Sequence, residues 1–68
     1  MEGIKMDYLN FKFNGRNISS EAFLSEEGIV TLLKFEDGKF VDQAKTTKDV
    51  FDSYIEEKLE DELITIIN

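Results

Sequence analysis

The side chains able to do chemistry in this chain are mostly acidic, and six of them gather in one short segment. The 68 residues include 15 Asp and Glu against 8 Lys and Arg, a formal net charge of −7. Near the C-terminal end the carboxylates recur every three or four residues, which places them along one side of an α-helix. This acidic set consists of Asp49, Asp52, Glu56, Glu57, Glu60 and Asp61. Such an array can coordinate a metal, perform acid–base catalysis or recognise a cationic partner.

The first two uses are disfavoured by the residues around the carboxylates. Histidine, the commonest general base and metal ligand, is absent, and so is cysteine. No segment has the D-x-[DN]-x-[DN]-G pattern of a calcium loop, and the carboxylates are expected to project from one helix into water. The four glycines are dispersed at expected turns and form no phosphate-binding loop. We therefore expect no catalytic residue, no cofactor and no metal, and the protein is predicted not to be an enzyme.

The third use of the acidic set, recognition of a cationic partner, remains open. The net negative charge disfavours direct binding of nucleic acid, because such binding depends on Lys and Arg displacing counterions from phosphates. Carboxylates one helical turn apart, about 5.4 Å, instead fall within the range of phosphate spacing along a nucleic acid strand. The acidic set is thus a candidate DNA mimic that contacts a basic, nucleic-acid-binding protein. The alternative is a charged surface that only keeps a small domain in solution.

The acidic set requires a helix to display it, and the segment from Thr46 to Leu59 has helical periodicity. Its apolar residues lie on the opposite side from the carboxylates, and they are Val50, Phe51, Tyr54, Ile55 and Leu59. Thr46 or Thr47 can cap the first turn. No Gly or Pro marks the end. The last residues are rich in β-branched types, so they either continue the helix or change to extended chain near Asp61 or Glu62 and form a short C-terminal strand. Leu63, Ile64 and Ile67 would drift away from the apolar stripe of a continued helix, and a helix ending around Asp61 to Leu63 is expected.

The preceding residues alternate in polarity between turns, which predicts strands. The turns are expected at Asn14-Gly15, at Ser25 to Gly28 and at Asp37-Gly38. They set Phe11 opposite Ile18, Leu24 opposite Ile29 and Phe35 opposite Phe40. The predicted fold is α+β: one domain, residues 1–68, with a small four-stranded antiparallel meander from Tyr8 to Ala44 and one C-terminal amphipathic helix packed on one face. A short helix at Ser20 to Glu27 is the competing interpretation of the middle segment.

These registers divide the apolar residues between the two faces of the sheet. The face under the helix is expected to form a core of Phe11, Ile18, Leu33, Phe35, Phe40, Phe51, Ile55 and Leu59. The opposite face is expected to carry an apolar "sheet patch" made of Met6, Tyr8, Phe23, Val30 and Leu32. A contiguous apolar patch usually has a cover. Three covers are considered: the Leu63 to Ile67 segment folding back, a second copy in a homodimer, or another partner.

The sequence shows neither a secretion signal nor an apolar run long enough to cross a bilayer, so a cytoplasmic location without a membrane partner is expected. The resulting functional hypothesis is a small acidic, non-enzymatic protein–protein interaction module. It would act as an inhibitor or regulator by presenting its acidic helix to a basic partner. The alternative is a structural, self-associating homo-oligomer that uses the sheet patch.

Overall fold

The computed structural model describes residues 6–68, which form five strands and one helix. In chain order these are β1 (Met6–Phe13), β2 (Ile18–Leu24), β3 (Ile29–Glu36), β4 (Lys39–Thr47), α1 (Lys48–Glu60) and β5 (Ile64–Ile66). The sheet is antiparallel with strand order β4-β3-β2-β1-β5. The predicted α+β class, the four-stranded meander and the C-terminal helix are therefore confirmed, and the chain ends in the short strand. The alternative of a helix at Ser20 to Glu27 is wrong, because β2 occupies that segment.

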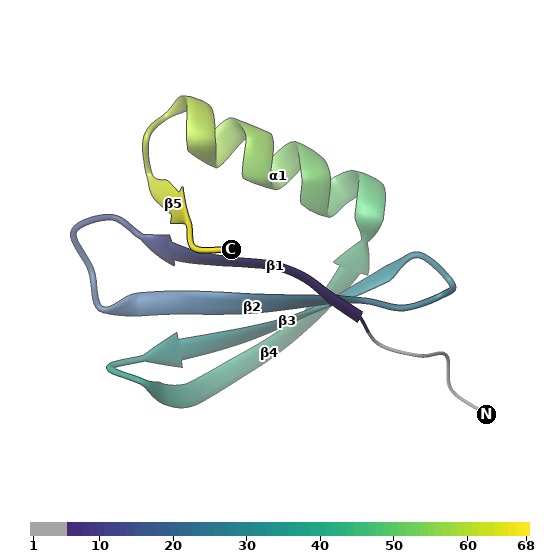
Figure 1. Ribbon diagram of the computed structural model, residues 1–68, viewed down its shortest axis with the longest axis horizontal. Helices are drawn as coiled ribbons and strands as arrows, with labels where there is room; N and C mark the ends of the chain where they lie inside the picture. The colour runs from purple at the N-terminus through teal and green to yellow at the C-terminus, as the bar shows by residue number, and fades with distance from the viewer. Residues whose placement is uncertain (1–5) are drawn as a thin grey trace.

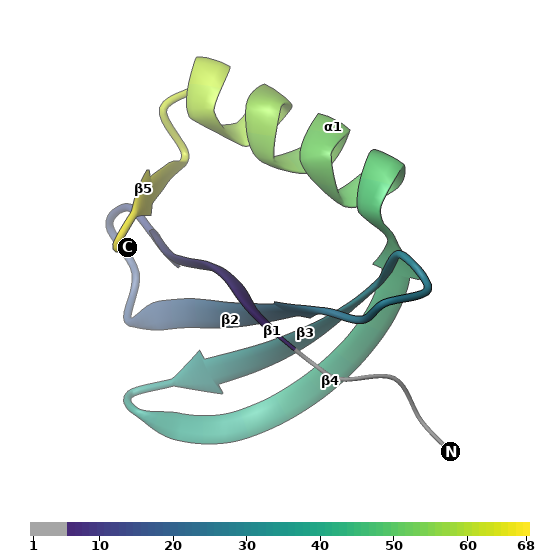
Figure 2. The same ribbon diagram turned by 45° about the vertical axis from the view of Figure 1, so that its right-hand side comes forward.

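The helix crosses the sheet because the strands that it joins lie at opposite edges. Strand β4 forms one edge and β5 the other. Five strands at about 4.8 Å spacing span about 19 Å, and the 13 residues of α1 span about 20 Å at 1.5 Å per residue. The helix thus has the length needed to reach across one face. Figures 1 and 2 show α1 above the curled sheet, running from the end of β4 toward β5.

The start of the helix follows the predicted cap. Thr47 has an extended backbone, and its hydroxyl accepts a hydrogen bond from the Val50 N–H at 3.4 Å. This satisfies one of the backbone donors that the first turn leaves without an intrahelical partner.

The end of the helix uses a motif that usually contains glycine. The Glu62 N–H donates to the Leu59 carbonyl at 3.1 Å, and the Leu63 N–H donates to the Lys58 carbonyl at 2.9 Å. This is the Schellman pattern, in which the residue after the C-cap adopts a left-handed conformation. Glu62 occupies that position with φ of 58°. A glutamate here gives no sequence signal for a helix end, which explains why the sequence left the boundary open.

The third predicted turn and the two residue pairs next to it are correct, but beyond Phe35 the register shifts by one residue at a bulge, so Ala44 lies opposite Leu32 on the helix side. Asp37 and Gly38 both have positive φ, 54° and 81°, as a type I′ hairpin requires. Strand β3 therefore pairs with β4 so that Phe35 faces Phe40 and Glu36 faces Lys39.

The first predicted register is wrong by two residues. Phe11 lies opposite Ser20 and Lys12 opposite Ser19, so the loop is longer than the Asn14-Gly15 pair alone. The predicted turn at Asn14-Gly15 does form, since the Arg16 N–H donates to the Phe13 carbonyl at 3.3 Å, but the loop continues to Asn17 before β2 begins. The Asn14 N–H also donates to the Leu63 carbonyl at 2.9 Å. Because side chains alternate with a period of two, this slip leaves every residue of β2 on its predicted face.

The second predicted register is wrong by one residue, and this slip has larger consequences. Leu24 pairs with Val30 and not with Ile29. The Ser25 N–H donates to the Ile29 carbonyl at 2.9 Å, so the ladder continues to Ser25 and leaves a loop of three residues, Glu26 to Gly28, with Gly28 in a left-handed conformation (φ 83°). A one-residue slip exchanges the two faces of a strand. In β3, Val30 and Leu32 therefore lie on the helix side, whereas Leu33 and Phe35 lie on the outer side.

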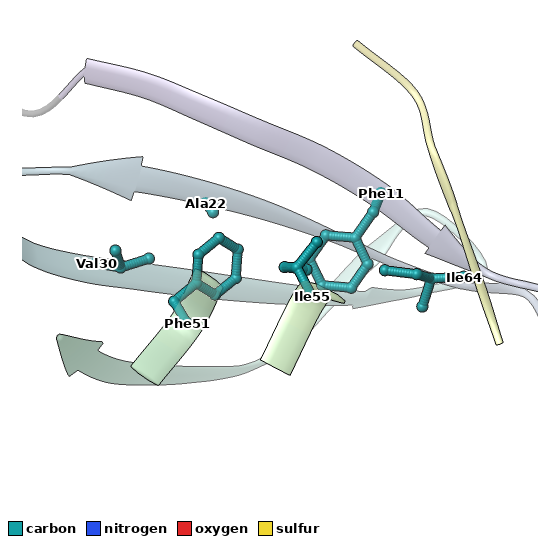
Figure 3. Close-up of a cluster of buried hydrophobic side chains, with 6 residues drawn as sticks. All are labelled: Phe11, Ala22, Val30, Phe51, Ile55 and Ile64. Atoms are coloured by element: carbon teal, nitrogen blue, oxygen red, sulfur yellow. The ribbon is translucent and has the colours of Figure 1, made fainter. Parts of the chain in front are cut away.

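The core lies between α1 and the inner face of the sheet (Figure 3). Six apolar residues are buried there: Phe11, Ala22, Val30, Phe51, Ile55 and Ile64. The ring of Phe51 has its centroid 5.8 Å from that of Tyr8 and 6.3 Å from that of Phe11. One helical aromatic side chain thus joins the helix to β1.

The predicted core is right for three of its eight members. Phe11, Phe51 and Ile55 are buried, and Ile18 is half-buried on the helix side. Leu33, Phe35 and Phe40 were placed in the core because of the register slip, and they lie on the outer face. Leu59 was assigned to the apolar stripe of the helix but is 43% exposed.

Candidate functional site

Five of the six predicted acidic residues share the solvent side of α1 and its C-cap. Asp49, Glu56, Glu57, Glu60 and Asp61 are all exposed, and within residues 6–68 none of them forms a salt bridge. These five residues are called the acidic face below. Repulsion between like charges is tolerated on this side because water surrounds each carboxylate. The helix therefore displays a surface of uncompensated negative charge, directed away from the sheet.

The sixth acidic residue, Asp52, has a different environment. Its carboxylate accepts a hydrogen bond from the Tyr8 hydroxyl at 2.7 Å and another from the Lys48 ammonium at 2.7 Å. Tyr8 reaches the helix because an irregularity in the β1–β2 register between Asp7 and Leu9 leaves it as an extra residue. Asp52 thus attaches the first turns of α1 to the sheet and is not part of the acidic face.

These contacts shift the acid–base equilibria of the three groups. The hydrogen bond from Lys48, and then that from Tyr8, holds the pKa of the Asp52 carboxyl below its usual value. The hydrogen bond to the Asp52 carboxylate raises the pKa of the Tyr8 hydroxyl and also that of the Lys48 ammonium. All three groups keep their ordinary charge states near neutral pH, so they favour a fixed structural contact.

The sheet patch is not brought together by the fold. Val30 is fully buried under the helix, and Tyr8 and Leu32 are half-buried against the core. Phe23 instead pairs with Thr31 on the outer face, and Met6 is 53% exposed near the beginning of β1. The premise that these five residues share one exposed face is wrong because of the one-residue slip in β3 and the irregularity in β1.

The expected cover for that patch is also absent from its predicted place. Strand β5 pairs with β1 at the edge of the sheet, with Phe11 opposite Ile66 and Phe13 opposite Ile64. Ile64 is 3% exposed and joins the core. The Leu63 to Ile67 segment thus extends the sheet and does not cover its outer face.

The outer face has an apolar group, three of whose four members the sequence assigned to the core. We call it the outer patch, and it comprises Phe23, Leu33, Phe35 and Phe40. The rings of Phe35 and Phe40 meet edge to face with their centroids 6.1 Å apart, and Phe40 is 56% exposed. The correct three-residue form of the second loop would have located this patch from sequence.

A second feature missed by the sequence is a cavity of about 220 Å³ between α1 and the inner face of the sheet. It is lined by apolar side chains together with Arg16, Ser20, Lys34 and Asp42. Lys34 lies opposite Ser20 and Asp42, so its position beside this cavity follows only from the observed register.

Other kinds of site find no support in the described part of the chain. Among residues 6–68 no group of three or more Asp or Glu side chains is arranged to hold a metal ion. No helix in the same range is long and apolar enough to cross a membrane. Comparisons with protein-family models, with curated proteins and with solved structures find no match. The function is therefore inferred from the arrangement of the charged and apolar surfaces.

Proposed function

We propose that this protein is a small, cytoplasmic, non-enzymatic interaction module that presents the acidic face of α1 to a basic surface of a protein partner. One observation carries the proposal: the five exposed carboxylates of the acidic face form no salt bridge within residues 6–68. A surface cation of the partner can therefore approach them without displacing an existing ion pair.

The position of the acidic face favours recognition by a nucleic-acid-binding protein. Asp49, Glu56 and Glu60 are exposed on α1, at positions separated by seven and by four residues, which returns each of them to nearly the same side of the helix. A rigid row of negative charges attracts a cationic groove and raises the rate of encounter. The partner class that fits this chemistry is a basic protein whose nucleic acid site the helix would occupy, which makes this chain an inhibitor or regulator.

The proposal is tested by affinity capture from cell lysate with three glutamates of the helix changed together. In the test variant Glu56, Glu57 and Glu60 become Gln, which removes charge but keeps side-chain shape. In the control variant three exposed glutamates of the loop and strand ends become Gln, namely Glu26, Glu27 and Glu36. Both variants have the same net charge.

The parent and the control should capture the same basic protein, and the test variant should lose it. Capture should also weaken as the ionic strength rises above about 0.15 M, where the screening length falls below about 8 Å. Added duplex DNA should release the captured protein if its nucleic acid site is occupied. Equal capture by both variants at the same salt concentration would refute a role for the acidic face.

Self-association through the outer patch is the second candidate function. It is favoured by Phe40, which is 56% exposed on the edge strand β4 and contacts the ring of Phe35 edge to face. Sedimentation equilibrium at micromolar concentration should then detect a dimer, and Phe40→Glu should return it to a monomer. Val50→Glu is the matched control, because Val50 is equally exposed, at 60%, but lies on the helix. A parent chain that remains monomeric would refute this candidate.

A further inference from the structure

The cavity under α1 has one lining residue on the helix, Tyr54, and the other lining residues belong to the sheet and to the loop between β1 and β2. Its apolar lining consists of Phe11, Phe13, Ile18, Leu32, Ala44 and Tyr54. Phe11 is 1% exposed and forms part of the floor. Ala44 on the edge strand β4 is exposed, and Tyr54 on α1 is half-buried. An apolar molecule can therefore enter between β4 and the helix and lie on Phe11.

The polar groups of the cavity lie around this apolar lining and include two cations. Arg16 and Lys34 are exposed and form no salt bridge within residues 6–68. Asp42 stands opposite Lys34 across the β3–β4 ladder, so the positive charge of Lys34 is partly balanced. Among the lining residues two cations, Arg16 and Lys34, stand against one carboxylate, Asp42. In a chain with a net charge of −7, this is a local positive region.

The floor also contains a hydroxyl group. Ser20 is 6% exposed and lines the cavity. Within residues 6–68 the buried side-chain atom without a hydrogen-bond partner is Asn10 Oδ1 and not the Ser20 hydroxyl. The floor is therefore partly polar without holding an unsatisfied group.

We propose that this cavity binds a small organic anion, a monocarboxylate with a short apolar tail. The volume of about 220 Å³ equals that of roughly seven waters at about 30 Å³ each, and it is smaller than the cavities of about 300–1,000 Å³ that hold drug-sized ligands. The tail lies on Phe11 and Leu32 under Tyr54. The carboxylate contacts Arg16 at the opening, and Lys34 assists it.

Hexanoate is the probe, and its binding to the uniformly ¹⁵N-labelled chain is followed by amide chemical shifts. The shifts should change for residues that line the cavity, Ser20, Leu32 and Ala44, and remain constant for Phe23 and Phe40 on the outer face. Hexan-1-ol has the same tail without the charge and should bind at least threefold more weakly. Hexylammonium should bind at least tenfold more weakly, because the opening is positive.

Two pairs of variants separate the cavity from general effects. Arg16→Gln with Lys34→Gln should weaken hexanoate binding at least fivefold, whereas Lys12→Gln with Lys45→Gln, which changes net charge equally on the outer face, should leave it unchanged. Ala44→Phe should fill the cavity and abolish binding. Its control is Lys45→Phe, one position along the same strand and directed to the other face.

Circular dichroism of each variant establishes that the fold is retained. The proposal is overturned if millimolar hexanoate leaves the cavity shifts unchanged, if a well-folded Ala44→Phe variant binds as the parent does, or if hexylammonium binds as tightly as hexanoate. These outcomes are independent of partner capture by the acidic face, since none of the four changed cations and neither Phe substitution lies on the exposed side of α1.

Discussion

The sharpest energetic prediction compares two phenylalanines that the sequence placed in the same core. Phe51 is 1% exposed and contacts the rings of Tyr8 and Phe11. Phe40 is 56% exposed and has a single ring neighbour, Phe35. Truncation of each to Ala removes the same atoms, so the difference in cost reports only where the two side chains lie.

The expected magnitudes differ by a factor of three or more. Removal of a buried phenylalanine ring costs about 3–5 kcal/mol, because apolar contact is lost and a cavity remains. Phe40 buries less than half of its surface, and full burial of such a side chain contributes about 1.5–3 kcal/mol. Phe40→Ala should therefore cost about 1 kcal/mol. A 68-residue chain has a total stability of about 3–10 kcal/mol, so Phe51→Ala removes much or all of it.

The assay is urea unfolding followed by far-ultraviolet circular dichroism. With a slope of about 1 kcal/mol per molar urea, Phe40→Ala should lower the midpoint by about 1 M. Phe51→Ala should lower it by about 3–5 M or leave the chain unfolded without urea. Val50→Ala, at a position 60% exposed on the same helix, controls for the helical segment and should stay close to the parent. A Phe40→Ala variant that loses as much stability as Phe51→Ala would refute the assignment of the two faces.

Two further predictions concern the helix and its attachment. Glu62→Gly should raise the free energy of unfolding by about 1 kcal/mol, because glycine adopts the left-handed conformation without steric cost. Glu62→Ala keeps the strain and should not raise the free energy of unfolding. Thermal unfolding of both variants would detect the difference. The pKa of Asp52 is lowered in the folded state by Lys48 and Tyr8, so its stabilising contribution is present above the unfolded pKa of about 3.9 and is lost as the pH falls through the lower folded value. The stability of the parent relative to Asp52→Asn should therefore be constant between about pH 5 and pH 8 and decline below about pH 4. A difference that persists unchanged at pH 2 would contradict the hydrogen-bonded position of this carboxylate.

The parts of the fold that the sequence predicts correctly depend on short-range chemistry. Asp37-Gly38 allows one compact turn, so the pairs next to it, Phe35 with Phe40 and Glu36 with Lys39, follow from two residues. The helix is defined by the periodicity that places Phe51 and Ile55 on one side, and Thr47 can cap it. In these segments the local preference and the global fold agree.

The parts that it misses depend on loop length and on contacts distant in the chain. In β3, Ile29 and Val30 are adjacent apolar residues, and so are Leu32 and Leu33, so either phase gives a reasonable apolar face. Only the three-residue loop ending at Gly28 decides between them, and its length is not encoded in the alternation itself.

The error in the first register has a similar cause, but it involves a contact between residues farther apart in the chain. Asn14 donates its side-chain amide to the Glu62 carbonyl at 3.1 Å, across 48 residues. No local sequence pattern indicates this contact, so the Asn14-Gly15 pair resembles a simple two-residue hairpin turn. The acidic face was accessible to prediction because it depends on helical spacing alone. The outer patch and the cavity were not, because both require the correct phase of β3.

The central claim is that Val30 and Leu32 face the helix while Leu33 and Phe35 face outward, since the outer patch and the cavity are both located relative to this arrangement. Nuclear Overhauser contacts from the Phe51 ring protons test it most directly. The account predicts strong contacts to the methyl groups of Val30 and Ala22, which lie beside Phe51 in the core (Figure 3). Contacts from Phe51 to Leu33, with none to Val30, would contradict it.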